Sequence, residues 1–343
     1  MPHNPIDPSV VDRLDPEYVA FHNAHLVDII PPERAPVWDP KIRDLPAVPG
    51  TSEPREVGSI QDFNLSKTNV RVVTPKGDRP ASGWPVFLWF HGGMLFTSLV
   101  ALQTHLYPNR WMDPRKHQLR NIFPAKCVTV SVNYRLAPED KYPVAVEDAV
   151  ESLHWVVNNG PKEISINPNR IAVGGSSSGG NLAAILALKA AELKIPLVFQ
   201  LLIVPVCDNT ASVENLWKEN ANAPWLTPVR MEWFKNNYLP NKEDWTKWDA
   251  SPAFAPIELM AKTPKAWIGV GEIDILMAEG IEYGEKLKRA GVEVETVIYP
   301  GAPHPIMAMD VWMHCRTVGV LQVGRNMIAD AGDALTRAFA ESS

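Results

Sequence analysis

The chain has 343 residues, of which 45% are hydrophobic and 21% charged, and its net charge is −6. This composition is ordinary for a globular protein with one large core or two smaller ones. The acidic balance, without a long basic run, excludes a dedicated nucleic-acid or anionic-membrane surface, and three cysteines are too few for a disulfide framework.

The chain begins with an irregular region in which prolines are dense. Residues 1–18 lack the apolar core of a secretory leader. No apolar run further along is long enough to span a bilayer. We therefore expect a cytoplasmic protein without stable membrane anchoring, whose first part is an extended arm packed over a later core.

From residue 70 onward, short β-branched or apolar stretches alternate with stretches of helical spacing. The predicted strands are residues 70–75, 86–90, 127–132, 170–173, 199–206, 266–270 and 294–299. The predicted helices are residues 144–157, 181–193, 279–290 and 316–340, the last interrupted around 319–324. This alternation predicts an α/β fold with a mostly parallel sheet covered by helices on both faces. Ligands of such sheets bind beyond the carboxyl ends of the strands.

The strongest motif follows the strand at 170–173, where residues 175–179 read GSSSG. They match G-x-S-x-G, a tight strand-to-helix turn that exposes a nucleophilic serine. Only Ser177 has glycine two positions before and two positions after it, so Ser177 is the predicted nucleophile. A flexible linker would lack the apolar flanks seen here, and a phosphate-binding loop would need a lysine after the glycines.

A second motif, His91-Gly92-Gly93, follows the strand at 86–90. Acyl transfer needs backbone N–H donors aimed at an oxyanion, and glycines let the backbone approach closely. A tight turn would explain the glycines equally well in isolation. Together with the serine turn, they indicate the second half of an oxyanion hole.

Five motifs in order, HGGM, NYRLAPE, GSSSGGN, DILMAEG and HPI, resemble those of the hormone-sensitive-lipase-like esterases. The resemblance runs from about residue 70 to the end of the chain. It implies an α/β-hydrolase fold with a helical cap. The implied division is a cap arm at 1–50, a core at 51–207 and 250–343, and a cap insertion at 208–249.

The resemblance also implies the other members of a catalytic triad. The carboxylate falls on Asp274 and the general base on His304, each after a late strand, in the chain order Ser, Asp, His that this fold uses. The rival residues are less well placed: His314 lies in helix-like sequence and Asp208 follows the wrong strand, while Asp310 is a further alternative.

The implied oxyanion donors are the N–H groups of Gly92, Gly93 and Ser178, with His91 holding the glycine loop. Met94 replaces a third glycine of the family pattern and places an apolar side chain near the acyl pocket. The insertion at 208–249 is rich in tryptophan, and we expect Met94, Trp217 and Trp225 to contact substrate. For either tryptophan, ordinary core packing is about equally plausible.

These residues predict a serine hydrolase that cleaves a small-molecule carboxylic ester through an acyl-enzyme, with no metal, organic cofactor or nucleic acid. A homodimer is compatible with the sequence. A lactone or amide hydrolase, an acyltransferase and a carboxylesterase-like dehydratase remain alternatives on the same fold. A small-molecule receptor on this fold is a second kind of alternative, but it would be expected to have lost a triad member, and all three positions are filled. A structural or interaction protein is a third, and the intact G-x-S-x-G turn argues against it.

Overall fold

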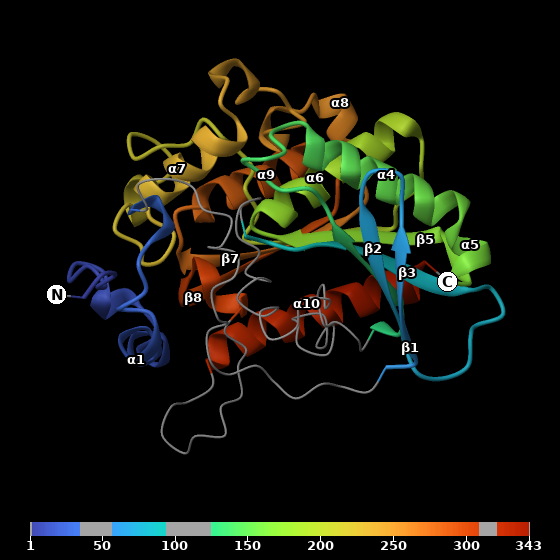
Figure 1. The fold of residues 1–343 in the computed structure, drawn as a ribbon, viewed down its shortest axis with the longest axis horizontal. Coiled ribbons are helices and arrows are strands. Elements are labelled where there is room, and N and C mark those ends of the chain that lie inside the picture. Colours follow the sequence, from blue (N-terminus) through green and yellow to red (C-terminus); the bar gives the residue numbers. More distant parts are fainter. Residues whose placement is uncertain (1, 35–56, 94–124, 309–320, 343) are drawn as a thin grey trace.

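The computed structural model describes residues 2–34, 57–93, 125–308 and 321–342. Its strands form one eight-stranded sheet in the order β1-β2-β4-β3-β5-β6-β7-β8 (Figure 1). The strands are β1 (Ser59–Asn64), β2 (Asn69–Thr74), β3 (Trp84–Phe90), β4 (Val128–Asn133), β5 (Ile166–Ser176), β6 (Phe199–Ile203), β7 (Ala266–Ile273) and β8 (Val294–Pro303).

In the order of the sheet, every pair of neighbours from β4 to β8 is parallel. At one edge, β1 pairs with β2 and β2 pairs with β4 in the antiparallel direction. Every residue of β3 and β6 is buried. Strands covered on both faces read as continuous apolar runs, which is why residues 86–90 and 199–203 carry no alternation. The expected mostly parallel sheet is confirmed.

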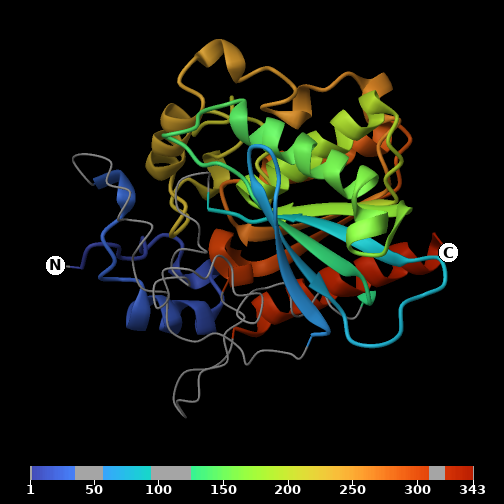
Figure 2. The same cartoon turned by 45° about the vertical axis from the view of Figure 1, so that its right-hand side comes forward.

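Helices cover both faces of this sheet. Helices α4, α6 and α9 lie on one face and α10 lies on the other, as two views show (Figures 1 and 2). The α-helices are α1 (Pro16–His25), α4 (Val144–Asn158), α5 (Gly160–Glu163), α6 (Ser178–Leu193), α7 (Pro228–Tyr238), α8 (Ile257–Met260), α9 (Met277–Arg289) and α10 (Gln322–Glu341). Short 3₁₀ turns are η1 (Val11–Arg13), η2 (Pro32–Arg34), η6 (Lys218–Asn220), η7 (Lys242–Asp244), η8 (Pro252–Phe254) and η9 (His304–Ala308). Among the described helices, none has the length and apolar character that crossing a bilayer requires.

The four predicted helices correspond to α4, α6, α9 and α10, although α6 begins three residues before the predicted start. Helices α1 and α7 and strand β1 were not predicted. Both helices begin at a side-chain cap: Asp15 accepts from the N–H groups of Glu17 and Tyr18, and Thr227 accepts from that of Arg230. The division into arm, core and cap insertion remains a prediction.

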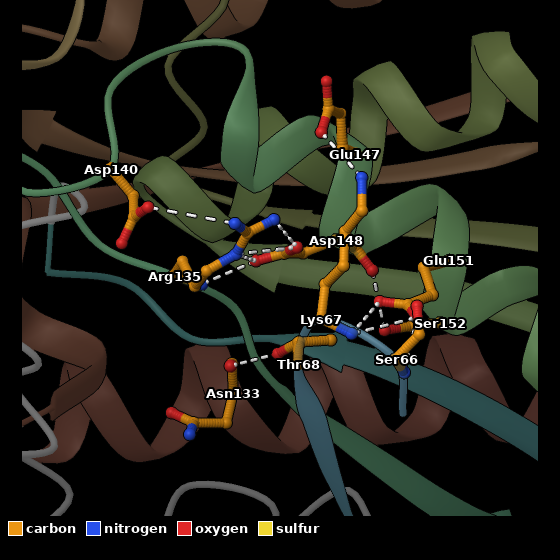
Figure 3. A network of polar contacts seen from close by, with 10 residues as sticks. All are labelled: Ser66, Lys67, Thr68, Asn133, Arg135, Asp140, Glu147, Asp148, Glu151 and Ser152. Carbon is orange, nitrogen blue, oxygen red and sulfur yellow. Dashed lines mark hydrogen bonds and ion pairs between the residues drawn. The ribbon is translucent and has the colours of Figure 1, made fainter. Parts of the chain in front are cut away.

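A polar network fastens the β1–β2 turn and the end of β4 to helix α4 (Figure 3). Arg135 donates to the buried carboxylate of Asp148 from its backbone N–H, its Nε and its Nη2, the last at 2.7 Å. Lys67 forms an ion pair with Glu147 in which both side chains are about half exposed. The network therefore contains one buried carboxylate and one solvent-exposed pair.

This contrast predicts unequal effects on stability. Arg135→Ala leaves the fully buried Asp148 carboxylate without its cation, and we expect the free energy of unfolding in urea to fall by about 3 kcal/mol. Lys67→Ala breaks an exposed ion pair of the same helix, so its effect should stay within about 1 kcal/mol. Equal effects of the two substitutions would contradict the assigned role of Arg135.

Candidate active site

Ser177 occupies a sharp turn between β5 and α6. Its φ is +56° and its ψ is −119°, a conformation that costs energy for any residue other than glycine. Its N–H donates to the carbonyl of Ile203 at 2.9 Å, which ties the turn to the end of β6. The turn carries the Ser177 side chain to the carboxyl edge of the sheet, where 3% of the residue is exposed.

The glycines two positions on either side of Ser177 are sterically required. A Cβ on Gly175 would lie 2.2 Å from the carbonyl oxygen of Gly179. A Cβ on Gly179 would lie 2.1 Å from the carbonyl oxygen of Phe90 in the neighbouring strand β3. No side chain fits at such distances. The spacing G-x-S-x-G is thus a packing requirement of this turn.

His304 and Asp274 meet Ser177 from the ends of two neighbouring strands. Asp274 follows β7 directly and His304 follows β8, and the residues just before them, Ile273 and Pro303, pair in the sheet. His304 Nε2 lies 2.9 Å from Ser177 Oγ, and His304 Nδ1 lies 2.7 Å from Asp274 Oδ2. The other carboxylate oxygen of Asp274 accepts from the N–H of Leu276 at 3.0 Å.

This arrangement fixes the imidazole tautomer. The Asp274 carboxylate accepts a hydrogen bond, so the proton of His304 lies on Nδ1. Nε2 is then an acceptor, and the hydroxyl of Ser177 donates to it. Asp274 and His304 are 1% and 6% exposed, so bulk water does not compete for these hydrogen bonds.

The turn after β3 lies against the nucleophile. A Cβ on Gly92 would lie 3.3 Å from Ser177 Cβ, which shows how closely this backbone approaches the serine. Burial lowers the pKa of His91 to about 4, so its ring is neutral. His91 Nδ1 donates to the Gly92 carbonyl at 2.9 Å, and its ring stacks on Tyr134. Because the peptide unit is planar, holding this carbonyl also sets the direction of the Gly93 N–H.

Ser178 is the first residue of α6. The first N–H groups of a helix have no partner within the helix and carry the positive end of its dipole. The N–H of Ser178 therefore has no partner within the helix, and it lies at the same end of α6 as Ser177. The structure brings all three expected oxyanion residues, Gly92, Gly93 and Ser178, to the neighbourhood of the serine; their role as donors stays a prediction.

Glu279 is a buried residue of the site region to which sequence reasoning gave no role, although it lies in the motif DILMAEG. Its Oε1 accepts from the N–H of Cys207 at 2.8 Å, and its Oε2 accepts from Trp217 Nε1 at 3.2 Å. Burial raises the pKa of Glu279 to about 8, against the lowering effect of these hydrogen bonds. The carboxyl group thus fastens the segment after β6 to helix α9.

The raised pKa of Glu279 predicts a pH-dependent stability. Between about pH 5 and 8 the folded chain holds a proton on Glu279 that the unfolded chain has released, so the free energy of unfolding should fall as the pH rises across this window. Glu279→Gln binds no such proton and should flatten the slope, measured by urea unfolding from pH 5 to 8.5. Glu285→Gln, on the exposed side of the same helix, should keep the wild-type slope. An unchanged slope in Glu279→Gln would contradict the assignment.

Lys235 of α7 holds the segment at 208–249 together. It is buried, and its Nζ lies between the rings of Trp217 and Trp245, 4.6 and 4.4 Å from their centroids. The three protons of Nζ have three acceptors: Glu232 and the carbonyls of Asn209 and Ala211. Lys235 therefore acts as an internal cross-link of the segment.

A small cavity of about 20 Å³, room for about one water molecule, lies between α6 and α7 next to Ser178. Its lining residues are Ser178, Asn181, Val206, Asn209, Phe234, Lys235 and Tyr238. Residues of the segment at 208–249 therefore lie next to the residue that follows Ser177.

The structure gives Trp217 and Trp225, which were predicted to contact substrate, other partners. Trp217 is buried and donates to Glu279, and the ring of the half-buried Trp225 packs against Arg230. These contacts indicate that Trp217 anchors its segment, and a substrate contact by either tryptophan stays a prediction. Met94 lies outside the described residues, as do the rivals His314 and Asp310. The rival Asp208 accepts from Thr210 in a local turn.

Comparisons with known proteins agree with this fold. Residues 87–308 match a family described as alpha/beta hydrolase fold. An AB hydrolase superfamily protein of Schizosaccharomyces pombe is 40% identical over 98% of this chain and 97% of its own. Esterase LipI of Mycobacterium tuberculosis is 36% identical over 74% of this chain and 76% of its own. The crystal structure of a thermostable esterase from Pseudomonas putida has a TM-score of 0.70 and 31% identity, and covers 82% of this chain and 83% of its own.

Proposed function

The chain belongs to the hormone-sensitive-lipase-like esterase family of the α/β hydrolases, and we propose that it cleaves its substrate through an acyl-enzyme on Ser177. It is a carboxylic ester hydrolase that acts on small-molecule esters. The observation that carries the mechanism is the unbroken chain of hydrogen bonds from Ser177 Oγ through His304 to Asp274.

In the acylation half, the Ser177 hydroxyl proton passes to His304 Nε2 as Oγ attacks the ester carbonyl carbon. Asp274 stabilises the imidazolium through the Nδ1 hydrogen bond. The carbonyl oxygen becomes an oxyanion, and the N–H groups of Gly92, Gly93 and Ser178 donate to it. When the intermediate collapses, the C–O bond to the alcohol breaks, and the leaving oxygen takes the proton from His304.

Deacylation repeats these steps with water. His304 removes a proton from water, and the hydroxyl attacks the carbonyl carbon of the acyl-enzyme. The second intermediate breaks its bond to Ser177 Oγ, which recovers the proton from His304, and the carboxylic acid leaves. The same donors serve both intermediates, so the site needs only one oxyanion hole.

The segment at 208–249 and the arm at 1–50 are proposed as a cap over this site. Three observations support a cap insertion: it lines the cavity beside Ser178, Lys235 cross-links it internally, and Glu279 fastens it to the core. Of the arm, η2 reaches α7 through the buried ion pair between Glu33 and Arg230 at 2.8 Å. Apolar contacts from such a cap would orient the substrate away from the reacting carbonyl.

A serine-reactive fluorophosphonate probe tests the proposal directly. We expect stoichiometric labelling on Ser177, located by mass spectrometry of the labelled peptide, and hydrolysis of p-nitrophenyl esters with a burst of p-nitrophenol when deacylation is slow. A protein that bound such esters without being labelled and without hydrolysing them would be a receptor, and the proposed mechanism would then be wrong.

A further inference from the structure

The end of strand β7 is irregular just before the triad carboxylate. The pairing of β7 with β8 shifts register here: Gly271 pairs with Tyr299 and Ile273 with Pro303, so β8 carries two extra residues and residues 300–302 lie opposite Glu272 alone. On the other side, β6 has already ended, since its last pair joins Ile203 to Gly269. The backbone carbonyls around Glu272 therefore need partners other than a neighbouring strand.

Asn220 supplies the partner. Its Nδ2 donates to the carbonyl of Glu272 at 2.8 Å and to the carbonyl of Asp274 at 3.0 Å. Asn220 is buried and belongs to turn η6, in the segment at 208–249. One side-chain amide thus holds the backbone on both sides of the peptide that leads into the triad carboxylate.

The N-terminal segment completes this contact. Arg13 Nη2 donates to Asn220 Oδ1 at 3.1 Å, so both protons of the Asn220 amide and its oxygen have partners. Two residues later, the Asp15 N–H donates to the Gly301 carbonyl at 3.0 Å, three positions before His304. Gly301 has a φ of +65°, and a Cβ there would lie 2.7 Å from Asp15 N. Residues 13–15 therefore contact the end of β8, which carries the base, and reach the end of β7, which carries the acid, through Asn220. Figure 1 shows α1 next to β8.

We propose that Asn220 is a positioning residue for the Asp274–His304 pair, and that Arg13 holds the Asn220 amide in its productive orientation. This inference rests on the proposed function, because it assigns the pair its catalytic role. Asn220 fixes where the Asp274 carboxylate lies relative to His304 Nδ1. Without it, the carbonyls of Glu272 and Asp274 lose this donor, and the end of β7 with the turn that follows it can shift. A displacement of about 1 Å is enough to lower the rate of the chemical step strongly.

The test compares kcat and KM for a p-nitrophenyl ester, with kcat normalised to the molecules that a fluorophosphonate probe labels at completion. Asn220→Ala should lower kcat about 10- to 100-fold and change KM less than about twofold. Asn220→Asp keeps the shape and the acceptor for Arg13 but removes both amide protons, so it should lower kcat in the same way. Arg13→Ala, at a partly exposed position, should lower kcat about 3- to 10-fold.

The double substitution shows whether Arg13 and Asn220 affect kcat through one another or independently. If Arg13 acts through Asn220, then Arg13→Ala combined with Asn220→Ala should have the kcat of Asn220→Ala alone. The matched control is Asn222→Ala, whose amide joins the same segment to Ser9 of the arm at 3.0 Å without reaching Asp274. It should keep kcat within about twofold of the wild type.

Two results would overturn the inference while leaving the proposed function intact. In an enzyme whose activity depends on Ser177, wild-type kcat per labelled site in Asn220→Asp would show that the amide protons are not needed. If the fold reductions in kcat of the two single variants multiplied in the double variant, Arg13 would not act through Asn220. The proposed function fails by a different result, an enzyme that is not labelled and whose activity does not depend on Ser177.

Discussion

Replacing Ser177 with alanine should abolish labelling by a fluorophosphonate probe and lower kcat for p-nitrophenyl acetate by a factor on the order of 10³ or more. The hydroxyl removed is the group that His304 Nε2 meets at 2.9 Å, so no nucleophile remains at the end of the hydrogen-bond chain. Activity left over would come from the oxyanion donors and from substrate binding alone. Initial rates at saturating ester measure the effect.

Ser176→Ala is the matched control for Ser177→Ala. Ser176 is equally buried and adjacent, but it is the last residue of β5 and not the residue at the turn. Its replacement should keep most of the activity and all of the labelling. A dead Ser176→Ala protein beside an active Ser177→Ala protein would move the nucleophile by one position and refute the assignment.

Asp274→Asn should lower kcat by a factor on the order of 10⁴ without unfolding the protein, as the corresponding change does in other triads. The amide of asparagine can donate to His304 Nδ1, which moves the ring proton to Nε2. A protonated Nε2 cannot accept the Ser177 proton. The new side chain has the shape of the old one, so the Leu276 N–H keeps an acceptor. Circular dichroism before the kinetic assay separates this effect from loss of the fold.

Asp208→Asn is the control for the carboxylate. Asp208 was the rival from the sequence, and its Oδ1 accepts from the N–H of Thr210 at 2.7 Å in a turn after β6. Its replacement should leave kcat within a few-fold of the wild type. If Asp208→Asn lost activity while Asp274→Asn kept it, the acid of the proposed triad would have to be reassigned.

The sequence predicts the core of the fold because its signals are local and sterically forced. The buried strands β3 and β6 read as apolar runs, and Gly175 and Gly179 have no room for a side chain. The order of the motifs then places Asp274 and His304 after two strands that the sheet sets side by side. When the order of the strands can be predicted, the proximity of residues that follow neighbouring strands can be predicted too.

Helices α1 and α7 were harder to predict because their buried faces mix polar or charged residues with apolar ones. Helix α7 buries Arg230 and Lys235 together with Met231 and Phe234, so its inner face shows no apolar periodicity in the sequence. The environment makes these charges tolerable: Glu33 pairs with Arg230, and two indole rings and three oxygens enclose Lys235. Asn220 could not be identified from the sequence for a different reason: its partners lie in segments far away along the chain.

The contacts of Asp15 and Glu17 with residues near the other end of this sequence have a consequence for how the protein is made. Asp15 bonds to Gly301, and Glu17 accepts from the N–H of Gln322, 305 residues further along the chain. During synthesis, α1 leaves the ribosome long before these partners exist, so these two hydrogen bonds can form only after most of the chain has been made. Helix α1 is therefore among the last elements to form its tertiary contacts. Contacts this distant in sequence also slow folding, because a large loop must close before they form.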